Sequence, residues 1–214
     1  MKRLIILLIT VLFFPLFMQA QTVEISPFGG YVFPARISVS GGYVRFNGNA
    51  QYGGMVSVGV SRVIDVDILY NRIDTKAELN VINYPYQQAP LSINYMHIGF
   101  TKNFRISTMF SPFCGINAGA CLMAPKSSDY TAEWFFSMGL NGGAKIYFSK
   151  RFGIRLQAQA LVPIQGAGFC FVIGTGGSGG GVSLNSTMVQ FGFTGGLIFR
   201  LGYVPDANAT RITY

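Results

Sequence analysis

Few side chains in this sequence are suited to catalysis. His97 is the only histidine among 214 residues, and a histidine can act as a base when it contacts a hydroxyl or thiol nucleophile. No recognisable nucleophile motif accompanies it. The surrounding segment, SINYMHIGF, does not keep one clean alternation and allows a β-bulge. We therefore expect a structural histidine in a strand and no catalytic residue; a catalytic base is the alternative.

The three cysteines have no spacing typical of a metal site. They are Cys114, Cys121 and Cys170. No CxxC pair or cysteine–histidine cluster is present in the sequence, so we expect no metal and no cofactor. An odd number leaves at least one thiol unpaired. A disulfide between Cys121 and Cys170 and three free thiols both remain open.

A glycine-rich run, GTGGSGGG at residues 174–181, resembles a phosphate-binding loop only superficially. Such a loop needs a following Gly-Lys-Ser or Gly-Lys-Thr and a strand-to-helix context, and this run has neither. We expect the flexible tip of a loop. Four apolar residues before it are expected to pack into the mouth of the molecule or to contact a partner: Phe169, Phe171, Val172 and Ile173.

The elements that position these residues are predicted to be strands. In residues 134–148 every second residue is apolar, and the residues between them are mostly polar or glycine. Residues 152–164 repeat this pattern after a short polar turn at 149–151. A period of two is typical of a strand whose two faces have different surroundings. The two segments therefore predict a β-hairpin.

Composition indicates which surroundings these are. Hydrophobic residues make up 50% of the chain and charged residues only 11%, whereas roughly 25% is usual for charged residues in soluble domains. After residue 20, no apolar segment reaches the ~18 residues of a membrane helix. Only helices and closed barrels satisfy every backbone group in lipid. We therefore predict an all-β fold, an eight-stranded antiparallel transmembrane β-barrel with an apolar outer face and a polar lumen.

The eight strands are predicted at residues 22–33, 53–62, 64–73, 90–101, 107–121, 133–148, 152–164 and 188–202. Three connections are short, and the four long ones are 34–52, 74–89, 122–132 and 165–187. Short turns of such barrels are periplasmic and long loops extracellular, so both termini are expected in the periplasm. Trp134, Phe148 and Phe152 are expected to form aromatic girdles at the two interfaces.

Both ends of the chain are predicted to lie outside the barrel. Lys2 and Arg3, the apolar run that follows them and the small Ala20 are typical of a secretory signal peptide at residues 1–20. Residues 21–203 are then the barrel, and residues 204–214 a short periplasmic tail. A retained membrane anchor is the alternative interpretation of the N-terminal segment.

Six charged residues share the phase predicted to face the lumen: Glu24, Asp65, Asp67, Lys145, Arg155 and Arg200. An eight-stranded barrel has an interior just wide enough for side chains, where an unpaired charge is costly. We expect a salt-bridged plug of three acids and three bases that closes the lumen; a gate that opens for small solutes is the alternative. Five polar residues are expected to line the same lumen: Asn141, Gln157, Gln159, Gln190 and Thr194.

The sequence resembles the small outer-membrane β-barrel proteins of Bacteroidota and, more distantly, the eight-stranded OmpA-barrel and OmpX class. The resemblance rests on PFGGY at 27–31, KIYFSKRFGIRLQAQ at 145–159, GTGGSGGG at 174–181 and FTGGLIFRLG at 193–202. It implies residence in the cell outer membrane of a Gram-negative bacterium, and a role as an adhesin, a structural barrel or a narrow porin-like pore. It carries over no catalytic residue.

Two function classes follow. The first is a structural or surface-interaction barrel, adhesin-like or supporting envelope integrity, whose extracellular loops carry the role. The second is a narrow, low-conductance channel for small solutes; a lipid A-modifying enzyme is a third. Expected partners are outer-membrane lipids, lipopolysaccharide and an envelope or host surface protein, with no support for nucleic acid, and a monomer is expected. Loop bases that would meet lipopolysaccharide phosphates are Arg36, Arg45, Lys76 and Lys126.

Overall fold

A computed structural model of the chain describes residues 22–39, 42–81, 87–126, 132–164, 169–173, 180–184 and 188–202. The predicted signal peptide and the predicted tail lie outside these residues, as does most of the glycine-rich run. Within the described ranges there is no helix with the length and apolar character needed to cross a membrane.

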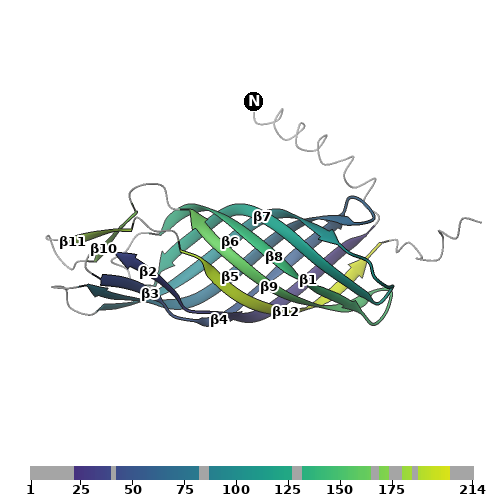
Figure 1. Ribbon diagram of the computed structural model, residues 1–214, viewed down its shortest axis with the longest axis horizontal. Coiled ribbons are helices and arrows are strands. Elements are labelled where there is room, and N and C mark those ends of the chain that lie inside the picture. The colour runs from purple at the N-terminus through teal and green to yellow at the C-terminus, as the bar shows by residue number, and fades with distance from the viewer. Residues whose placement is uncertain are drawn as a thin grey trace, which may run out of the picture.

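Eight long strands form a closed antiparallel barrel (Figure 1). They are β1 (Val23–Val32), β4 (Asn49–Gly59), β5 (Ile64–Val81), β6 (Gln87–Asn103), β7 (Phe110–Pro125), β8 (Glu133–Tyr147), β9 (Phe152–Ile164) and β12 (Gln190–Leu201). Each pairs with the next long strand along the chain, and β1 closes the barrel by pairing with β12. The predicted fold is confirmed.

Two short hairpins extend one end of the barrel (Figure 1). β2 (Ala35–Val39) pairs with β3 (Gly42–Phe46), and β3 adds to β5 beyond the point where β4 leaves it. β10 (Phe169–Ile173) and β11 (Gly180–Leu184) form a separate two-stranded sheet. We call the end of the barrel that carries these two hairpins the hairpin end. The opposite end, with the turns at 60–63, 104–109 and 148–151, is the short-turn end. The side chains of Phe169, Phe171, Val172 and Ile173 lie outside the described part of the structure.

The loops predicted at 34–52 and 74–89 are largely strands, so this part of the prediction is wrong. β2, β3 and the first residues of β4 occupy the first range, and β5 and β6 continue through the second as one long hairpin. The reason is a reversal of the alternation. The outward side chains of β5 are apolar up to Tyr70 but polar or charged from Arg72 onward, while the inward side chains of Ile73, Thr75 and Ala77 are buried.

The outer surface of the barrel carries exposed apolar side chains on every long strand. The three predicted girdle residues, Trp134, Phe148 and Phe152, are all exposed on it, and the rings of Phe152 and Phe199 pack edge to face 5.6 Å apart. We call this surface the apolar belt. A contiguous exposed apolar surface of this extent indicates contact with lipid or another apolar partner.

A hydrophobic core fills the lumen at the hairpin end. We call this the apolar cap; its buried members are Val32, Ala35, Val44, Phe46, Ile73, Ala77, Leu91, Ile93, Tyr95, Cys121, Met123, Leu161 and Met188. Cys121 is a free thiol inside the cap, so it forms no disulfide, and the side chain of Cys170 lies outside the described residues. Cys114 is a free thiol on the exposed outer surface. The molecule is therefore polar inside along the belt and apolar inside at the hairpin end.

Two adjacent glycines of β4 provide a test of how closely the strands approach. A Cβ atom added at Gly53 would lie 2.0 Å from the Tyr70 carbonyl oxygen, whereas one added at Gly54 would meet nothing within 4 Å. We expect Gly53→Ala to lower the free energy of unfolding by about 1–3 kcal/mol, because neighbouring backbone must move. Gly54→Ala is expected to be neutral or stabilising by up to about 1 kcal/mol. Urea titration of the refolded barrels measures both; equal effects would contradict the close approach at Gly53.

Candidate functional site in the barrel lumen

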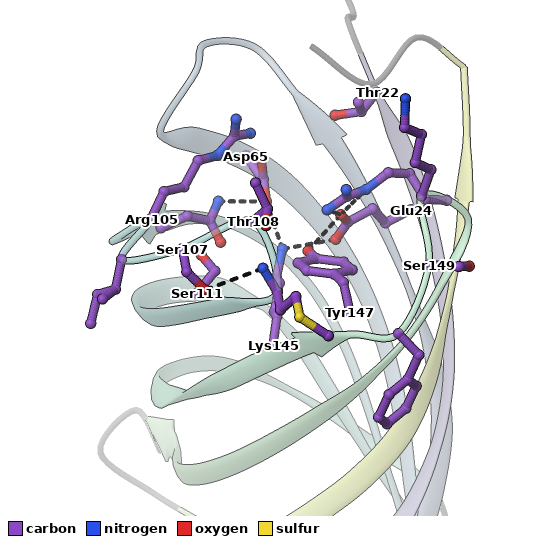
Figure 2. A pocket seen from close by; sticks show the side chains of 16 residues that line it. Thr22, Glu24, Asp65, Arg105, Ser107, Thr108, Ser111, Lys145, Tyr147 and Ser149 are labelled. Atoms are coloured by element: carbon purple, nitrogen blue, oxygen red, sulfur yellow. Dashed lines mark hydrogen bonds and ion pairs between the residues drawn. The ribbon is translucent and has the colours of Figure 1, made fainter. Parts of the chain in front are cut away.

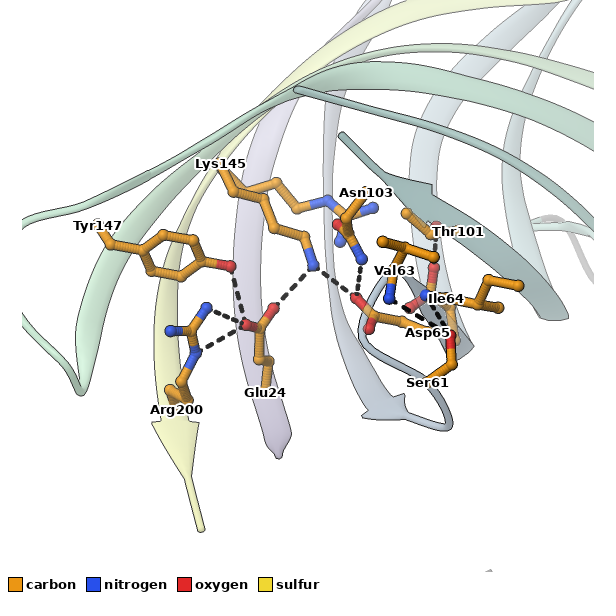
Figure 3. Close-up of polar contacts among 12 residues, drawn as sticks. Glu24, Ser61, Val63, Ile64, Asp65, Thr101, Asn103, Lys145, Tyr147 and Arg200 are labelled. Atoms are coloured by element: carbon orange, nitrogen blue, oxygen red, sulfur yellow. Dashed lines mark hydrogen bonds and ion pairs between the residues drawn. The ribbon is translucent and has the colours of Figure 1, made fainter. Parts of the chain in front are cut away.

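Four charged side chains meet inside the barrel near the short-turn end (Figure 3). Lys145 Nζ lies 2.8 Å from Glu24 Oε2 and 2.8 Å from Asp65 Oδ2. Arg200 Nη2 lies 2.8 Å from Glu24 Oε1 on the other side of that carboxylate. We call these four residues the charge cluster. They come from β1, β5, β8 and β12, so the cluster ties opposite walls of the barrel together.

Neutral donors add further hydrogen bonds to the two acids. The Tyr147 hydroxyl donates to Glu24 Oε1 at 2.9 Å, and Asn103 Nδ2 donates to Asp65 Oδ2 at 2.8 Å. The guanidinium of Arg200 lies over the Tyr147 ring, 3.8 Å from its centroid. Buried charges are tolerated when pairing and additional hydrogen bonds compensate for lost hydration. The sequence did not predict the roles of Tyr147 and Asn103.

The expectation that all six lumen charges form ion pairs is wrong for Asp67 and Arg155. Asp67 accepts a hydrogen bond from the Thr101 hydroxyl. Arg155 donates from Nε to Gln157 Oε1 at 2.9 Å and lies over the Phe113 ring, 4.1 Å from its centroid. Its Nη1 and Nη2 atoms are buried with no partner among the described residues. Arg155 stands directly opposite Lys145 in the register, and Lys145 already pairs with Glu24 and Asp65.

A chain of amide side chains continues from Arg155 along the lumen. Gln157 Nε2 donates to Gln159 Oε1 at 3.1 Å, and Gln159 Nε2 donates to Gln51 Oε1 at 2.8 Å. Asn71 donates to the same Gln51 oxygen at 3.0 Å. We call this chain the amide ladder. All five residues predicted to line the lumen are buried and inward-facing; besides the two glutamines of the ladder they are Asn141, Gln190 and Thr194.

His97 also faces the lumen. Its Nδ1 lies 2.6 Å from Asn117 Oδ1, and its Nε2 lies 2.5 Å from Ser137 Oγ. β6 pairs with β5 and β7 in unbroken register through this residue, so the β-bulge that the sequence allowed is not present there. Ser137 is 0% exposed, so no substrate can reach its hydroxyl in this arrangement. The trio was not predicted because its members lie on three strands far apart in the sequence.

A cavity of about 590 Å³ opens at the short-turn end and ends at the charge cluster (Figure 2). Glu24, Asp65 and Lys145 form its inner wall, and the turns at 104–109 and 148–151 form its rim. Arg105 on the first of these turns is exposed. The lumen is thus accessible from this end only as far as Lys145.

Comparison with known proteins identifies the architecture. No protein-family model matches the chain, and no curated protein sequence matches it. Among solved structures, the outer membrane protein OprG from Pseudomonas aeruginosa is similar with a TM-score of 0.59 at 10% identity, covering 86% of this chain and 97% of that one. The chain has the fold of the eight-stranded outer-membrane barrels.

Two further barrels support the same assignment. Neisserial surface protein A has a TM-score of 0.55 at 8% identity, covering 84% of this chain and 96% of its own. The outer membrane protein AlkL, determined in lipid bilayers, has a TM-score of 0.51 at 10% identity, with coverage of 86% and 92%. Identities this low establish the fold alone, and membership of the Bacteroidota proteins stays a prediction.

A second ion-pair network lies on the outer surface of β5, just beyond the apolar belt. Asp74 Oδ1 lies 3.2 Å from Arg72 Nη2 and 3.1 Å from Lys126 Nζ, and the Tyr52 hydroxyl donates to its other oxygen at 3.1 Å. The hydrogen bond from Arg72, supported by those from Lys126 and Tyr52, lowers the pKa of Asp74 from 3.8 to about 2. Ionised Asp74 is therefore favoured in the folded protein.

This network predicts a small dependence of stability on pH. Because the pKa of Asp74 is lower in the folded state, its contribution is present above about pH 4 and is lost as the pH falls toward 2. We expect less than about 1 kcal/mol, because the charges are partly solvated. Urea unfolding of Asp74→Asn should differ from the parent at pH 6, and the difference should shrink by pH 2. An unchanged difference at pH 2, or an equal effect of Glu133→Gln, would contradict this account.

Proposed function

We propose that the chain is an outer-membrane barrel with a closed lumen, whose hairpin end is an extracellular contact surface. One observation carries the proposal: the lumen is blocked at two levels, by the apolar cap at the hairpin end and by the charge cluster at the inner wall of the cavity at the short-turn end. A structural, adhesin-like or envelope-supporting role needs a rigid barrel of this kind and does not need a path for solutes through the lumen.

The apolar belt supports insertion in a membrane. Its exposed aliphatic and aromatic side chains surround a lumen of hydrogen-bonded polar groups, which is the inverse of a soluble barrel. Outer-membrane barrels place short turns in the periplasm and long segments outside. In this orientation both ends of the barrel domain, in β1 and β12, face the periplasm, and the hairpin end faces the exterior.

The apolar cap supports closure. An apolar constriction excludes water and ions by dewetting, even where a lumen is otherwise polar. Below it, Gln51 holds the walls together, because its Nε2 donates to the carbonyls of Tyr31 and Phe193, each at 3.2 Å. The charge cluster then acts as the plug at the periplasmic side. We infer that solutes do not pass at rest.

The hairpin end supports a role in contacts. β5 and β6 are paired from Ile64 and Lys102 to Leu79 and Gln87, well beyond the belt, and β3 adds to this sheet. Hydrogen-bonded strands over a packed core present side chains at fixed positions, so this end of the barrel loses less conformational entropy on binding a partner than a mobile loop would.

A narrow channel is the second candidate, and a specific observation favours it. Arg155 keeps two buried nitrogen atoms without partners among the described residues, directly beyond the cavity that ends at Lys145. Buried polar atoms of this kind are commonly satisfied by internal water. A hydrated path would then run from the periplasm to the amide ladder, and only movement of the cap would complete it.

Planar-bilayer recording of the refolded mature protein separates the two candidates. The closed barrel predicts no discrete conductance from protein whose insertion is verified by its heat-dependent gel mobility. Arg155→Ala should be equally silent, with Arg62→Ala as the control on an exposed turn. Discrete conductance of the parent that changes in Arg155→Ala and not in Arg62→Ala would overturn the closed barrel in favour of the channel.

A further inference from the structure

Two arginines stand directly opposite each other on the outer face of the hairpin end. Arg36 of β2 and Arg45 of β3 are register partners, and both are exposed. Directly opposite side chains have Cβ atoms only about 4.5–5.5 Å apart, and like charges in such a pair are destabilising. The hairpin therefore carries an unfavourable pair that a bound anion would make favourable.

A single acid among the described residues, Glu78, faces this pair, and one carboxylate offsets only part of its charge. The register partner of Arg45 on its other side is Glu78, but Glu78 Oε1 accepts hydrogen bonds from Asn47 at 2.7 Å and Gln88 at 3.0 Å. Lys76 is a diagonal neighbour of Arg45 on the same face, at roughly 7–8 Å. Three bases against one acid leave this patch with a net charge of +2.

The guanidinium of Arg36 is also held in place. Its Cζ lies 4.3 Å from the centroid of the Tyr43 ring. Stacking on an aromatic ring restrains the guanidinium while its edge N–H groups stay free to donate. Two guanidinium groups on directly opposite residues suit a tetrahedral oxyanion, since each can form paired N–H···O bonds.

The height of the pair above the apolar belt selects the kind of anion. Glu78, level with Arg45, lies eight positions beyond Tyr70, the last outward apolar residue of β5. At about 3.3 Å per residue and a tilt near 45°, this is roughly 19 Å above the belt. The lipid headgroup region is only about 5–8 Å deep on each side. A phosphate on the lipid itself is therefore too low to reach the pair.

We infer that Arg36 and Arg45 together bind a phosphate or sulfate group carried on a saccharide. The inference rests on the proposed function only in taking the hairpin end as extracellular. Two sources present this chemistry: the phosphorylated core saccharide of lipopolysaccharide in the same membrane, and a free sulfated or phosphorylated polysaccharide. Lys76 adds a third positive charge for a neighbouring anionic group.

The test compares two charge-matched double variants of the refolded barrel in detergent. R36Q/R45Q removes the proposed site, and R62Q/R105Q removes the same charge from exposed turns at the opposite end. Dextran sulfate is the free-polysaccharide probe, and purified phosphorylated lipopolysaccharide in bicelles is the membrane probe. Binding is measured by calorimetry in 50 mM and 500 mM salt, because general charge attraction is screened at high salt.

We expect R36Q/R45Q to lose at least tenfold in affinity for one or both probes, and R62Q/R105Q to stay within about twofold. Loss for dextran sulfate alone assigns a free polysaccharide, and loss for lipopolysaccharide alone assigns the membrane glycan. R36K/R45K, which keeps the charge without the guanidinium forks, should retain only part of the affinity. Equal losses in the two glutamine variants, or none in either, would overturn the inference. This test measures binding and not conductance. A negative result here would therefore overturn the anion site without overturning the proposal of a closed lumen.

Discussion

Replacing Lys145 with methionine is expected to lower the free energy of unfolding by about 3–5 kcal/mol, because removing one partner leaves buried charges uncompensated. Lys145 Nζ contacts both Glu24 and Asp65 at 2.8 Å, and its side chain is 2% exposed. Arg200 would still pair with Glu24, whereas Asp65 would keep only the hydrogen bond from Asn103. The larger part of the loss should therefore come from Asp65.

The chain contains a single tryptophan, Trp134, which gives a fluorescence signal for urea unfolding in detergent or liposomes. Lys76→Met is the matched control at an exposed site and should change the free energy by no more than about 0.5 kcal/mol. Adding Asp65→Asn to Lys145→Met should recover part of the loss, because the orphaned charge is removed. If Lys145→Met unfolds at the same urea concentration as the parent, the cluster does not stabilise the barrel.

Ile93→Ala is expected to lower the free energy of unfolding by about 2–5 kcal/mol, the range for emptying a packed core. Ile93 is 0% exposed and belongs to the apolar cap together with Tyr95, Ile73 and Leu161. The expected cost includes both the lost burial of three carbon atoms and the cavity that remains.

Ile106→Ala makes the same chemical change on an exposed turn, where Ile106 is 72% exposed, and should stay within about 0.5 kcal/mol. Both variants can be followed by the Trp134 signal and by heat-dependent gel mobility. A loss for Ile93→Ala no greater than that for Ile106→Ala would mean that the cap is loosely packed, and would weaken the argument for a closed lumen.

The barrel was predictable wherever the two faces of a strand contrast in polarity. On β8 and β9 one face is in the belt and the other in the lumen, so the period of two predicted their ends to within one residue. The inward phase of Glu24, Asp65 and Lys145 followed from the same alternation, and all three are buried in the lumen.

Partners across the lumen were not predictable in the same way. The alternation along a strand predicts which side chains face the lumen. Which of these side chains meet across the lumen depends on the stagger of all the strands in the closed sheet, and this cannot be predicted from any one strand. Lys145 and Glu24 are 121 positions apart, and His97 and Ser137 are 40 apart. The incomplete pairing of Arg155 could not be foreseen for this reason.

The extension beyond the belt was missed because its pattern is that of a water-soluble sheet. After Tyr70 the outward residues of β5 are polar and the inward ones, beginning with Ile73, are mostly apolar. A template that requires apolar residues outside reads this as loop, although the period of two is unbroken. A search for segments in which the apolar residues switch from outward to inward positions, while the alternation of two continues, would have found it.

The reversal at Tyr70 also bears on how the barrel stays in position once assembled. The outward side chains that follow it on β5 include Arg72, Asp74, Lys76 and Glu78. Arg or Lys on the lipid face at the midplane of a bilayer costs about 2–4 kcal/mol. In the orientation proposed above, sliding the barrel toward the periplasm would carry these charges into hydrocarbon one after another. The same residues would then oppose withdrawal of the inserted barrel from the membrane.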